Sequence, residues 1–470
     1  MEGAAVHGTA DGATALGDEA LEICQALLRI DTTNPPGNER PAADLLDRRL
    51  RDAGYEPAIL ESAPGRANLV CRFRGSGEKP PLLLACHLDV VEAAADRWRY
   101  PPFSGEIAEG CLWGRGAIDM KNMAAMSAAV MRKLARDRVK LTRDVIFAAV
   151  ADEEAGCDQG SRWLVENHPE LVRAEYALGE VGGFSLHLGK ASYYPVQVAE
   201  KGSCWIRARV RGEPGHGSMP RPDSAVVKLG EAISRLGKAR LPTFPTATAR
   251  DFFRHVAAHQ PRLMRPLARA FARPELLGRL LRLAPNEATS RGVQALLANT
   301  ATPTVARAGR KVNVIPEVAE FQIDGRTLPG QSDDDLLAQL RDVLGPDVEL
   351  EIMRSAPPVV TEPYESPLYD VIRSEIETRE PSARVVPYLT PGYTDAKHFS
   401  KLGTRWYGFS PVKIEKESGI RFADMFHGDN ERVPIAGLRW GADVLYSVVT
   451  RFCAAGRGAT VDVDNRRPPE

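Results

Sequence analysis

The chain has 470 residues, of which 43% are hydrophobic and 26% charged, the composition of an ordinary soluble globular protein. Its 61 Lys and Arg residues nearly balance its 62 Asp and Glu residues, so no overall positive charge draws it to nucleic acid or to an anionic membrane. A chain of this length exceeds one hydrophobic core of usual size, and we expect at least two domains.

The cysteines and the chain ends indicate a cytoplasmic protein. The seven Cys are scattered, with no Cys-x-x-Cys pair, which favours reduced thiols over a disulfide framework. The first residues carry Glu2 and Asp11 and lack the basic and apolar regions of a signal peptide, and no apolar run reaches the length of a membrane span. We expect flexible tails at 1–17 and 455–470.

The first part of the chain, which we assign to 1–195, alternates predicted helices with predicted strands. Asp18 is placed to cap a first helix, and the apolar run LLLACHLDVV at 82–91 contains a predicted buried strand that ends at His87. Strands that alternate with helices predict a three-layer α/β/α domain with a largely parallel sheet. Ligands bind beyond the carboxyl ends of the strands in such sheets, so we expect the functional site there.

The pattern changes over 196–354, where the predicted order of elements is β-α-β-β-α-β. This is the ferredoxin-like pattern, and we interpret it as a second domain inserted into the first, which resumes over 355–470. Within the insert, the segment 243–300 is helical and basic, and its Leu/Ala/Arg spacing at 262–283 predicts amphipathic helices. We interpret this segment as an elaboration of a lid or dimer face, in preference to a membrane-binding or calmodulin-like segment.

His87 and Asp89 form a His-x-Asp motif at the end of a predicted strand. Because they are two positions apart, their side chains lie on the same side of the strand. The imidazole can bind a metal while the carboxylate supports it, although an isolated motif of this kind is more often a buried hydrogen-bonded pair. The remainder of the chain is needed to decide between the two.

Four further clusters place acids or a histidine near predicted element ends: Asp119 in CLWGRGAIDMKNM, Asp152, Glu153 and Glu154 in VADEEAGCDQGS, Glu180 in YALGEVGG, and His427 in FHGDNERV. Taken alone, each has an ordinary explanation as a helix cap, a solvated turn, an exposed acid or a surface histidine. Several of them nevertheless share the carboxyl ends of predicted strands with His87, where a doubly wound sheet builds its site.

Two histidines and several carboxylates are ligands that suit Zn²⁺, with Mn²⁺ or Co²⁺ as substitutes. With Glu153 and Glu154 adjacent, one carboxylate can bind metal while the other takes a proton from metal-bound water, whose pKa the metal lowers from about 15.7 toward about 7. Two metals that share a bridging carboxylate can hold the water and a substrate carbonyl together. Cys86 and Cys157 lie beside these clusters, but we interpret them as small buried residues because the nitrogen and oxygen set is already complete.

The chain resembles the zinc-dependent metallohydrolase family of aminoacylase, acetylornithine deacetylase, succinyl-diaminopimelate desuccinylase and carboxypeptidase G. The resemblance rests on ACHLDVV, WGRGAIDMK, ADEEAGCDQGS, GEPGHGSMP, NVIPE, DGRTLPG, PGYTDAKHF and FHGDNE, which occur in the family's order between about 20 and 453. It implies a catalytic domain of the phosphorylase/hydrolase-like type with an inserted ferredoxin-like lid domain that serves dimerisation.

The resemblance implies two zinc ions and five ligands: His87 and Glu180 on one metal, Glu154 and His427 on the other, and Asp119 between them. It further implies that Asp89 orients His87, that Glu153 is the general base, and that His216 helps to stabilise the oxyanion. The histidine equivalent to His216 commonly comes from the other subunit in this family, so a homodimer through the inserted domain is expected. The long segment 243–300 leaves open whether His216 acts within one chain.

The resemblance also implies a substrate site that contains Asn313, Arg326, Gly392 and Thr394. Arg326 is suited to a substrate carboxylate because a guanidinium forms a bidentate fork with it. We interpret the nearby His398 as structural.

The predicted function is hydrolysis of the amide bond of an N-acyl amino acid at a two-zinc centre. The alternative is a dipeptidase or carboxypeptidase that acts on small peptides with a free carboxylate, because the metal chemistry is the same for both. A non-catalytic metal-binding homologue is a third hypothesis, against which the presence of Glu153 and of a complete ligand set argues. No nucleic-acid or membrane partner is expected.

Overall fold

The computed structural model describes residues 11–188, 191–260 and 287–454. The chain forms two compact units, each discontinuous in sequence. The first extends to His187 and also includes Glu365–Val385 and the chain from His398, whereas the second comprises Leu188–Tyr364 and Val386–Lys397. The domain limits at 195 and 354 stay a prediction, because units of packing need not be folding domains.

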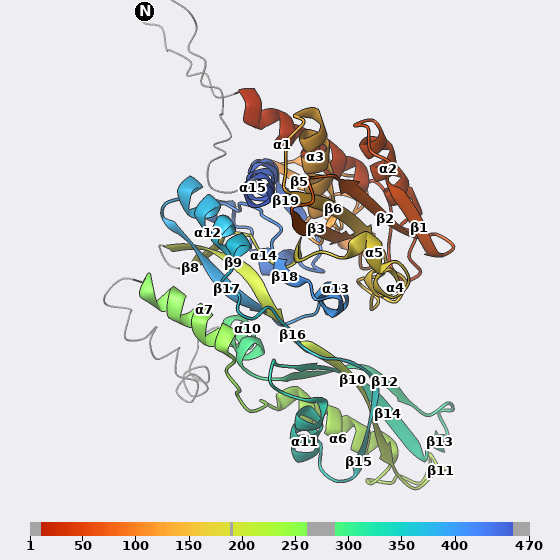
Figure 1. Cartoon of the computed structure of the whole chain (residues 1–470). Coiled ribbons are helices and arrows are strands. Elements are labelled where there is room, and N and C mark those ends of the chain that lie inside the picture. Colours follow the sequence, from red (N-terminus) through yellow and green to blue (C-terminus); the bar gives the residue numbers. More distant parts are fainter. Residues whose placement is uncertain (1–10, 189–190, 261–286, 455–470) are drawn as a thin grey trace, which may run out of the picture. The chain divides into compact units, whose positions relative to one another are not determined.

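The first unit is built on a sheet with the strand order β1-β2-β6-β3-β7-β18 (Figure 1). These strands are β1 (Ala58–Ala63), β2 (Arg66–Phe73), β3 (Lys79–His87), β6 (Arg143–Val150), β7 (Tyr176–Gly179) and β18 (Arg405–Gly408). β3 is parallel to both β6 and β7, and β7 is parallel to β18, whereas β2 pairs antiparallel with β1 and β6. The buried strand predicted to end at His87 is confirmed, and near-continuous apolar runs such as Leu82–Leu84 reflect burial on both faces.

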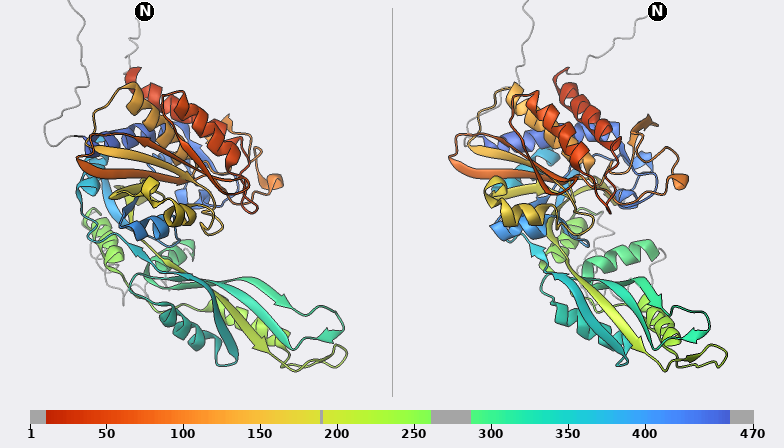
Figure 2. Two further views of the ribbon diagram at one scale, coloured as in Figure 1. Left: turned by 45° about the vertical axis from the view of Figure 1, so that its right-hand side comes forward. Right: turned by 90° about the vertical axis from the view of Figure 1, so that its right-hand side faces the viewer.

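Helices cover this sheet from both sides, with α1, α2, α3 and α15 on one face and α4 and α5 toward the other (Figure 2). The helices of this unit are α1 (Asp11–Leu28), α2 (Arg40–Arg51), α3 (Lys121–Arg136), α4 (Ser161–Asn167), α5 (Pro169–Val172), α12 (Pro367–Arg379), α13 (Ala396–Phe399), α14 (Phe422–Met425) and α15 (Ile435–Cys453). In α3 the side chains from Lys121 to Met131 are all buried, because its Ala and Met residues allow close packing on several sides. The protein thus has the mixed α/β fold that alternating elements predict.

Helix α1 begins at Asp11, ahead of Asp18, which we expected to cap it. The apolar side of the helix already includes Leu16, which is buried together with Ala20 and Ile23 one and two turns further on. The flexible tail predicted for 1–17 is therefore wrong for the helical part. The remaining tail residues, 1–10 and 455–470, lie outside the described residues.

The second unit contains an antiparallel sheet with the order β12-β14-β10-β15. In chain order its elements are β10 (Gly202–Arg211), α6 (Ala225–Lys238), β12 (Thr300–Ala308), β14 (Val318–Thr327), α11 (Asp333–Leu344) and β15 (Val348–Ala356). This order of strands and helices is the predicted β-α-β-β-α-β pattern, in which α7 (Ala247–Ala258) and α10 (Glu287–Leu297) are additional. The whole of the predicted amphipathic stretch at 262–283 falls in 261–286, outside the described residues.

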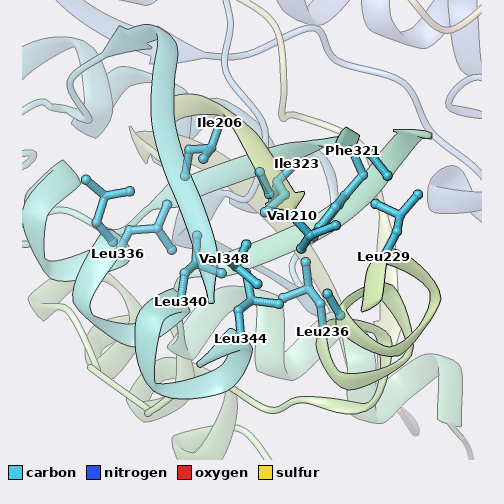
Figure 3. Close-up of a cluster of buried hydrophobic side chains, with 14 of the residues drawn as sticks. Ile206, Val210, Leu229, Leu236, Phe321, Ile323, Leu336, Leu340, Leu344 and Val348 are labelled. Atoms are coloured by element: carbon cyan, nitrogen blue, oxygen red, sulfur yellow. The ribbon is translucent and has the colours of Figure 1, made fainter. Parts of the chain in front are cut away.

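One face of this second sheet forms an apolar core with α6 and α11 (Figure 3). Ile206 and Val210 of β10 point into that core with Phe321 of β14, whereas the Arg residues between them face away, as the two-residue period of a strand requires. Ser224 caps α6, and Ser332 and Asp335 form a capping box at α11.

Shorter elements complete the two units: η1 (Ala95–Arg97), β4 (Glu106–Ala108), β5 (Cys111–Trp113), β8 (Leu186–Leu188), β9 (Ala191–Glu200), β11 (Gly215–His216), β13 (Val314–Ile315), β16 (Val359–Val360), β17 (Ala383–Thr390), η3 (Ser400–Leu402), η4 (Lys416–Ser418) and β19 (Arg432–Pro434). None of the helices in the described part of the chain combines the length and hydropathy needed to cross a membrane.

Candidate active site

The parallel strands of the first unit deliver polar side chains to one edge of the sheet. β3 ends at His87, β6 ends just before the acidic turn Asp152–Glu154, and β7 ends just before Glu180. His87 lies opposite Val150 in the register of β3 and β6, so these strand ends are level. Carboxyl ends of parallel strands meet at the same sheet edge, which explains why residues far apart in sequence converge here.

Five side chains from separate segments form one cluster around Asp119. His87 Nε2 lies 3.0 Å from Asp119 Oδ1 and 3.5 Å from Glu180 Oε2. His427 Nε2 lies 3.3 Å from Asp119 Oδ2 and 3.1 Å from Glu154 Oε2. Each carboxylate oxygen of Asp119 therefore faces a different histidine, the arrangement that a bridging ligand between two cations requires.

The orientation of His87 is set by the main chain. Its Nδ1 lies 2.9 Å from the carbonyl oxygen of Asp89 and, because a carbonyl only accepts, the Nδ1–H donates. This leaves the lone pair of Nε2 directed at the acids, as in a metal-binding imidazole. The Asp89 carboxylate is 3.5 Å from the ring and instead accepts hydrogen bonds from the main-chain N–H groups of Glu153 and Glu154, each at 3.1 Å. Asp89 thus holds the acidic turn as well as the histidine.

The crowding of acids and imidazoles perturbs their protonation. Burial, and then the nearby Asp119 carboxylate, raise the pKa of Glu154 to about 7. Hydrogen bonds to Asp119 and Glu154 raise the pKa of His427 to about 10. Burial opposes charging of His87, but the surrounding carboxylates outweigh it and hold the pKa of that imidazole well above its usual value. The cluster therefore attracts positive charge, which protons or metal cations can supply.

The donor set fits divalent metal ions. In candidate metal groups of the described residues, ligand atoms of His87, Asp119 and Glu154 lie within 4.8 Å of one another, as do those of His87, Glu153 and Glu180. Glu154 Oε1 is buried and has no hydrogen-bond partner in the described part of the protein, so it is an acceptor with a coordination position to fill. Imidazole and carboxylate ligands suit Zn²⁺, Mn²⁺ and Co²⁺.

The model of the Peptidase family M20/M25/M40 matches residues 83–451. The chain belongs to this family. The N-fatty-acyl-amino acid synthase/hydrolase PM20D1 of Xenopus tropicalis is 30% identical over 363 residues, which cover 75% of this chain and 69% of the relative. Aminoacylase-1 of Sus scrofa is 32% identical over 222 residues, or 46% of this chain and 53% of the relative.

Solved structures show the same fold. The M20 family metallo-carboxypeptidase Sso-CP2 from Sulfolobus solfataricus has a TM-score of 0.69 at 17% identity, covering 93% of this chain and 99% of that chain. Together, the family and its members identify this M20 protein as a hydrolytic enzyme of the metallohydrolase class. The family resemblance inferred from the sequence motifs is confirmed.

Geometry alone does not separate the roles of the adjacent acids in this M20 site. Glu153 is buried and lies within ligand distance of His87 and Glu180, so its assignment as base rather than ligand rests on the family motif. Cys86 and Cys157 direct their thiols toward the main-chain carbonyls of Ala148 and Glu153, at 3.8 and 3.9 Å, and neither belongs to a candidate metal group in the described residues.

One residue that the sequence reasoning missed is Glu431, which is fully buried. Its carboxylate accepts hydrogen bonds from the N–H groups of Gly116, Ile118 and Asp119, at 3.0, 2.7 and 3.0 Å, and pairs with Arg115 at 2.8 Å. Glu431 therefore fixes the loop that carries the central acid. Its position in FHGDNERV, just after His427, was the available signal.

The sequence also gave no indication that Asn34 and Arg66 support the acidic turn. Asn34 Nδ2 donates to Asp89 Oδ2 at 2.8 Å and to Asp152 Oδ1 at 2.9 Å. Arg66 donates to the same Asp152 oxygen at 2.8 Å and also pairs with Glu39. The loop DTTNPPGNE shows turn-forming residues but no pattern that predicts this contact.

The remaining predicted residues of this M20 chain belong to the second unit. His216 is exposed, and its Nδ1 accepts a hydrogen bond from the Ser218 N–H at 3.2 Å, so a neutral ring carries its proton on Nε2. Asn313 is exposed and Gly392 half-buried, whereas Arg326 lies on β14 beside Asp324. Thr394, expected to contribute to the substrate site, is fully buried, and its hydroxyl donates to Glu200 at 2.6 Å.

Proposed function

We propose that this enzyme hydrolyses the amide bond of N-acyl amino acids. The observation that carries the proposal is the cluster of two histidines and three carboxylates with Glu153 beside it. The similarity to PM20D1 and to aminoacylase-1, whose names describe acyl-amino acid chemistry, supports this substrate class.

In the proposed mechanism two zinc ions, replaceable by Mn²⁺ or Co²⁺, would be held by His87, Glu180, Glu154, His427 and Asp119. When bound, such ions lower the pKa of a water molecule and polarise the amide carbonyl. Glu153 takes the proton of the attacking water and delivers it to the leaving nitrogen, since one carboxylate serves as base and then as acid. His216 donates its Nε2–H to the developing oxyanion. Arg326 binds the carboxylate of the substrate.

The same centre also serves the alternative of a dipeptidase or carboxypeptidase. The likeness to Sso-CP2, a metallo-carboxypeptidase by name, is a likeness of fold alone, but water attack on an amide carbonyl is common to both reactions. A panel of N-acetyl and N-fatty-acyl amino acids against dipeptides, assayed with zinc- or manganese-replete protein, separates the two. Turnover of the dipeptides alone would favour the alternative, and no turnover at all would revive a non-catalytic role.

The substitution Glu153→Gln tests the mechanism. It removes the proton acceptor while it keeps the shape of the side chain, so kcat should fall about 10²–10⁴-fold with metal content unchanged. Elemental analysis and steady-state kinetics on the same sample measure both. Glu166→Gln, at an exposed acid of α4 that pairs with Arg162, is the control and should keep full activity. A fully active Glu153→Gln enzyme would exclude Glu153 as the base.

The proposal extends to the assembly and location of the protein. The second unit would act as the lid and dimerisation domain that the family resemblance implies, so that closure completes the site and excludes water. We place the enzyme in the cytoplasm, since its seven buried cysteines form no disulfide.

A further inference from the structure

Two cations in the second unit share the ring of Tyr393. The guanidinium carbon of Arg326 lies 4.6 Å from the ring centroid, and the ammonium of Lys397 lies 3.3 Å from it. Both distances are within the range of cation–π attraction. The ring of Tyr393 therefore contacts two positive groups.

Lys397 is the unexplained member of this cluster. Only 8% of the residue is exposed, yet its ammonium forms no ion pair and no hydrogen bond with any residue in the part of the chain that the structure describes. A nearly buried charge is costly unless it is paired, and a ring face compensates only in part. Among the described residues, the carboxyl of Glu200 lies close enough to interact electrostatically with this charge, but no acid forms an ion pair with it.

Arg326 has a donor to spare in the same cluster. Its Nε and Nη2 lie 2.8 and 3.0 Å from the two oxygens of Asp324, which neutralises one positive charge. Its Nη1 is buried and has no hydrogen-bond partner in the described residues. Lys397 and Arg326 thus each keep N–H donors that have no acceptor among the described residues, and a carboxylate can supply such acceptors.

The segment that carries Tyr393 and Lys397 is held from below by a buried contact. The Thr394 hydroxyl donates to Glu200 Oε2 at 2.6 Å, and Gln197 Nε2 donates to the same oxygen at 2.9 Å. The Lys201 N–H donates to the carbonyl of Thr390 at 3.1 Å. Burial raises the pKa of Glu200 to about 8, although the hydrogen bond from Thr394 and the nearby charge of Lys397 act in the opposite direction, so this carboxyl offsets the charge of Lys397 only in part at pH 7.

Resting on the proposed function, we propose that Lys397 is a specificity-determining residue that binds the carboxylate of the substrate together with Arg326, with Tyr393 as the platform for both. Thr394 is then a positioning residue, whose buried hydroxyl holds the segment and does not touch the substrate. The enzyme accepts acids and discriminates against the corresponding amides, because an uncharged carboxamide leaves the two cations unmatched.

The test compares N-acetyl-leucine with N-acetyl-leucinamide, and N-lauroyl-leucine with N-lauroyl-leucinamide, on the zinc-replete enzyme. Lys397→Met keeps the length of the side chain and removes its charge. It should lower kcat/KM for the acids about 10- to 100-fold, mainly through KM, and leave the amides unchanged. Lys397→Arg should keep most of the preference for acids. The control is Lys401→Met, at an exposed lysine that lies 3.4 Å from His398. This control should change kcat/KM neither for the acids nor for the amides.

Calorimetric titration of the same proteins with leucine and leucinamide separates this inference from the proposed function. If Lys397→Met weakens leucine binding and Lys401→Met does not, the carboxylate site is supported. If the unmodified protein at the same time hydrolyses no acyl amino acid, the proposed reaction is disproved while the carboxylate site stands. If Lys397→Met lowers kcat/KM equally for acids and amides, or lowers it for neither, the proposed role of Lys397 is overturned. If Lys397→Met does not fold, Lys397→Gln supplies the neutral variant.

Discussion

At the scale of single residues, buried acids organise the candidate metal-binding centre without belonging to the candidate ligand set. Asp89 fixes the main chain of Glu153 and Glu154, and Glu431 fixes the loop that ends at Asp119. Both carboxylates are fully buried and accept several N–H donors, which compensates their loss of hydration. The positions of the candidate metal ligands thus depend on the hydrogen bonds that Asp89 and Glu431 accept.

The substitution Glu431→Gln probes this support. One oxygen of Glu431 accepts from Arg115 and Gly116, and the other accepts from Ile118 and Asp119. In glutamine an NH₂ group, which cannot accept, replaces one of these oxygens, so one of the two pairs of contacts is lost. Metal affinity should fall about 10- to 100-fold, as for other partners that orient ligands. Titration with Co²⁺, followed by its visible absorption, measures the affinity and the coordination geometry.

The control for this titration is Glu417→Gln, at an exposed acid of η4. It should bind Co²⁺ as the unmodified protein does. Unchanged affinity and absorption in Glu431→Gln would show that Asp119 keeps its place without this carboxylate.

At the scale of elements, strand ends and the segments that follow them decide the chemistry. The second unit provides an example in β9, whose last residue, Glu200, reaches the segment after β17 through Thr394. The contact joins residues that are 194 positions apart in the chain. A buried acid in such a place also makes the stability of the element depend on pH.

The pKa of Glu200 is raised by burial to about 8 from its ordinary value of 4.5, so the folded chain holds this proton more tightly than the unfolded chain. The free energy of unfolding should therefore contain a contribution that is complete below about pH 4.5 and is lost as the pH rises toward about 8. Glu200→Gln cannot ionise and should flatten this decline in denaturant titrations at a series of pH values. Glu231→Gln, at an exposed acid of α6, is the matched control. An identical decline in Glu200→Gln and the unmodified protein would contradict the assignment.

At the scale of the whole molecule, the residues of the proposed mechanism are divided between the two units. The candidate metal ligands and the base all lie in the first unit, whereas His216, Arg326 and Lys397 lie in the second. A ligand stabilises only the state that binds it, so bound metal should protect the first unit directly.

Removal of metal with a chelator should consequently increase amide hydrogen exchange in peptides that contain His87, Asp119 or Glu154. Peptides from the apolar core of the second unit, such as those of β10, serve as the internal control and should exchange as before. Mass spectrometry of the chelated and zinc-replete protein measures both. A uniform increase across the two units would show that metal stabilises the molecule globally.

The sequence alone determined the family, the mixed α/β fold and the cluster of candidate metal ligands. These depend on local patterns: an apolar run ending in His-x-Asp, a pair of adjacent acids after a strand, and a histidine before the last helix. Such signals can be recognised in the sequence because the carboxyl ends of parallel strands meet at one edge of the sheet, wherever the strands lie in the chain.

Only the tertiary structure decided which polar residues support those ligands and which are withdrawn from the site. Glu431 and Gly116 are 315 positions apart, and Glu200 and Thr394 are 194 apart, so no local period connects them. Thr394 proved buried, Lys397 proved to lack an ion pair in the described residues, and α1 proved to begin before the cap expected at Asp18. The physical reason is the same in each case: burial and hydrogen bonding depend on neighbours that the fold brings together, and a linear pattern of residue types does not specify them.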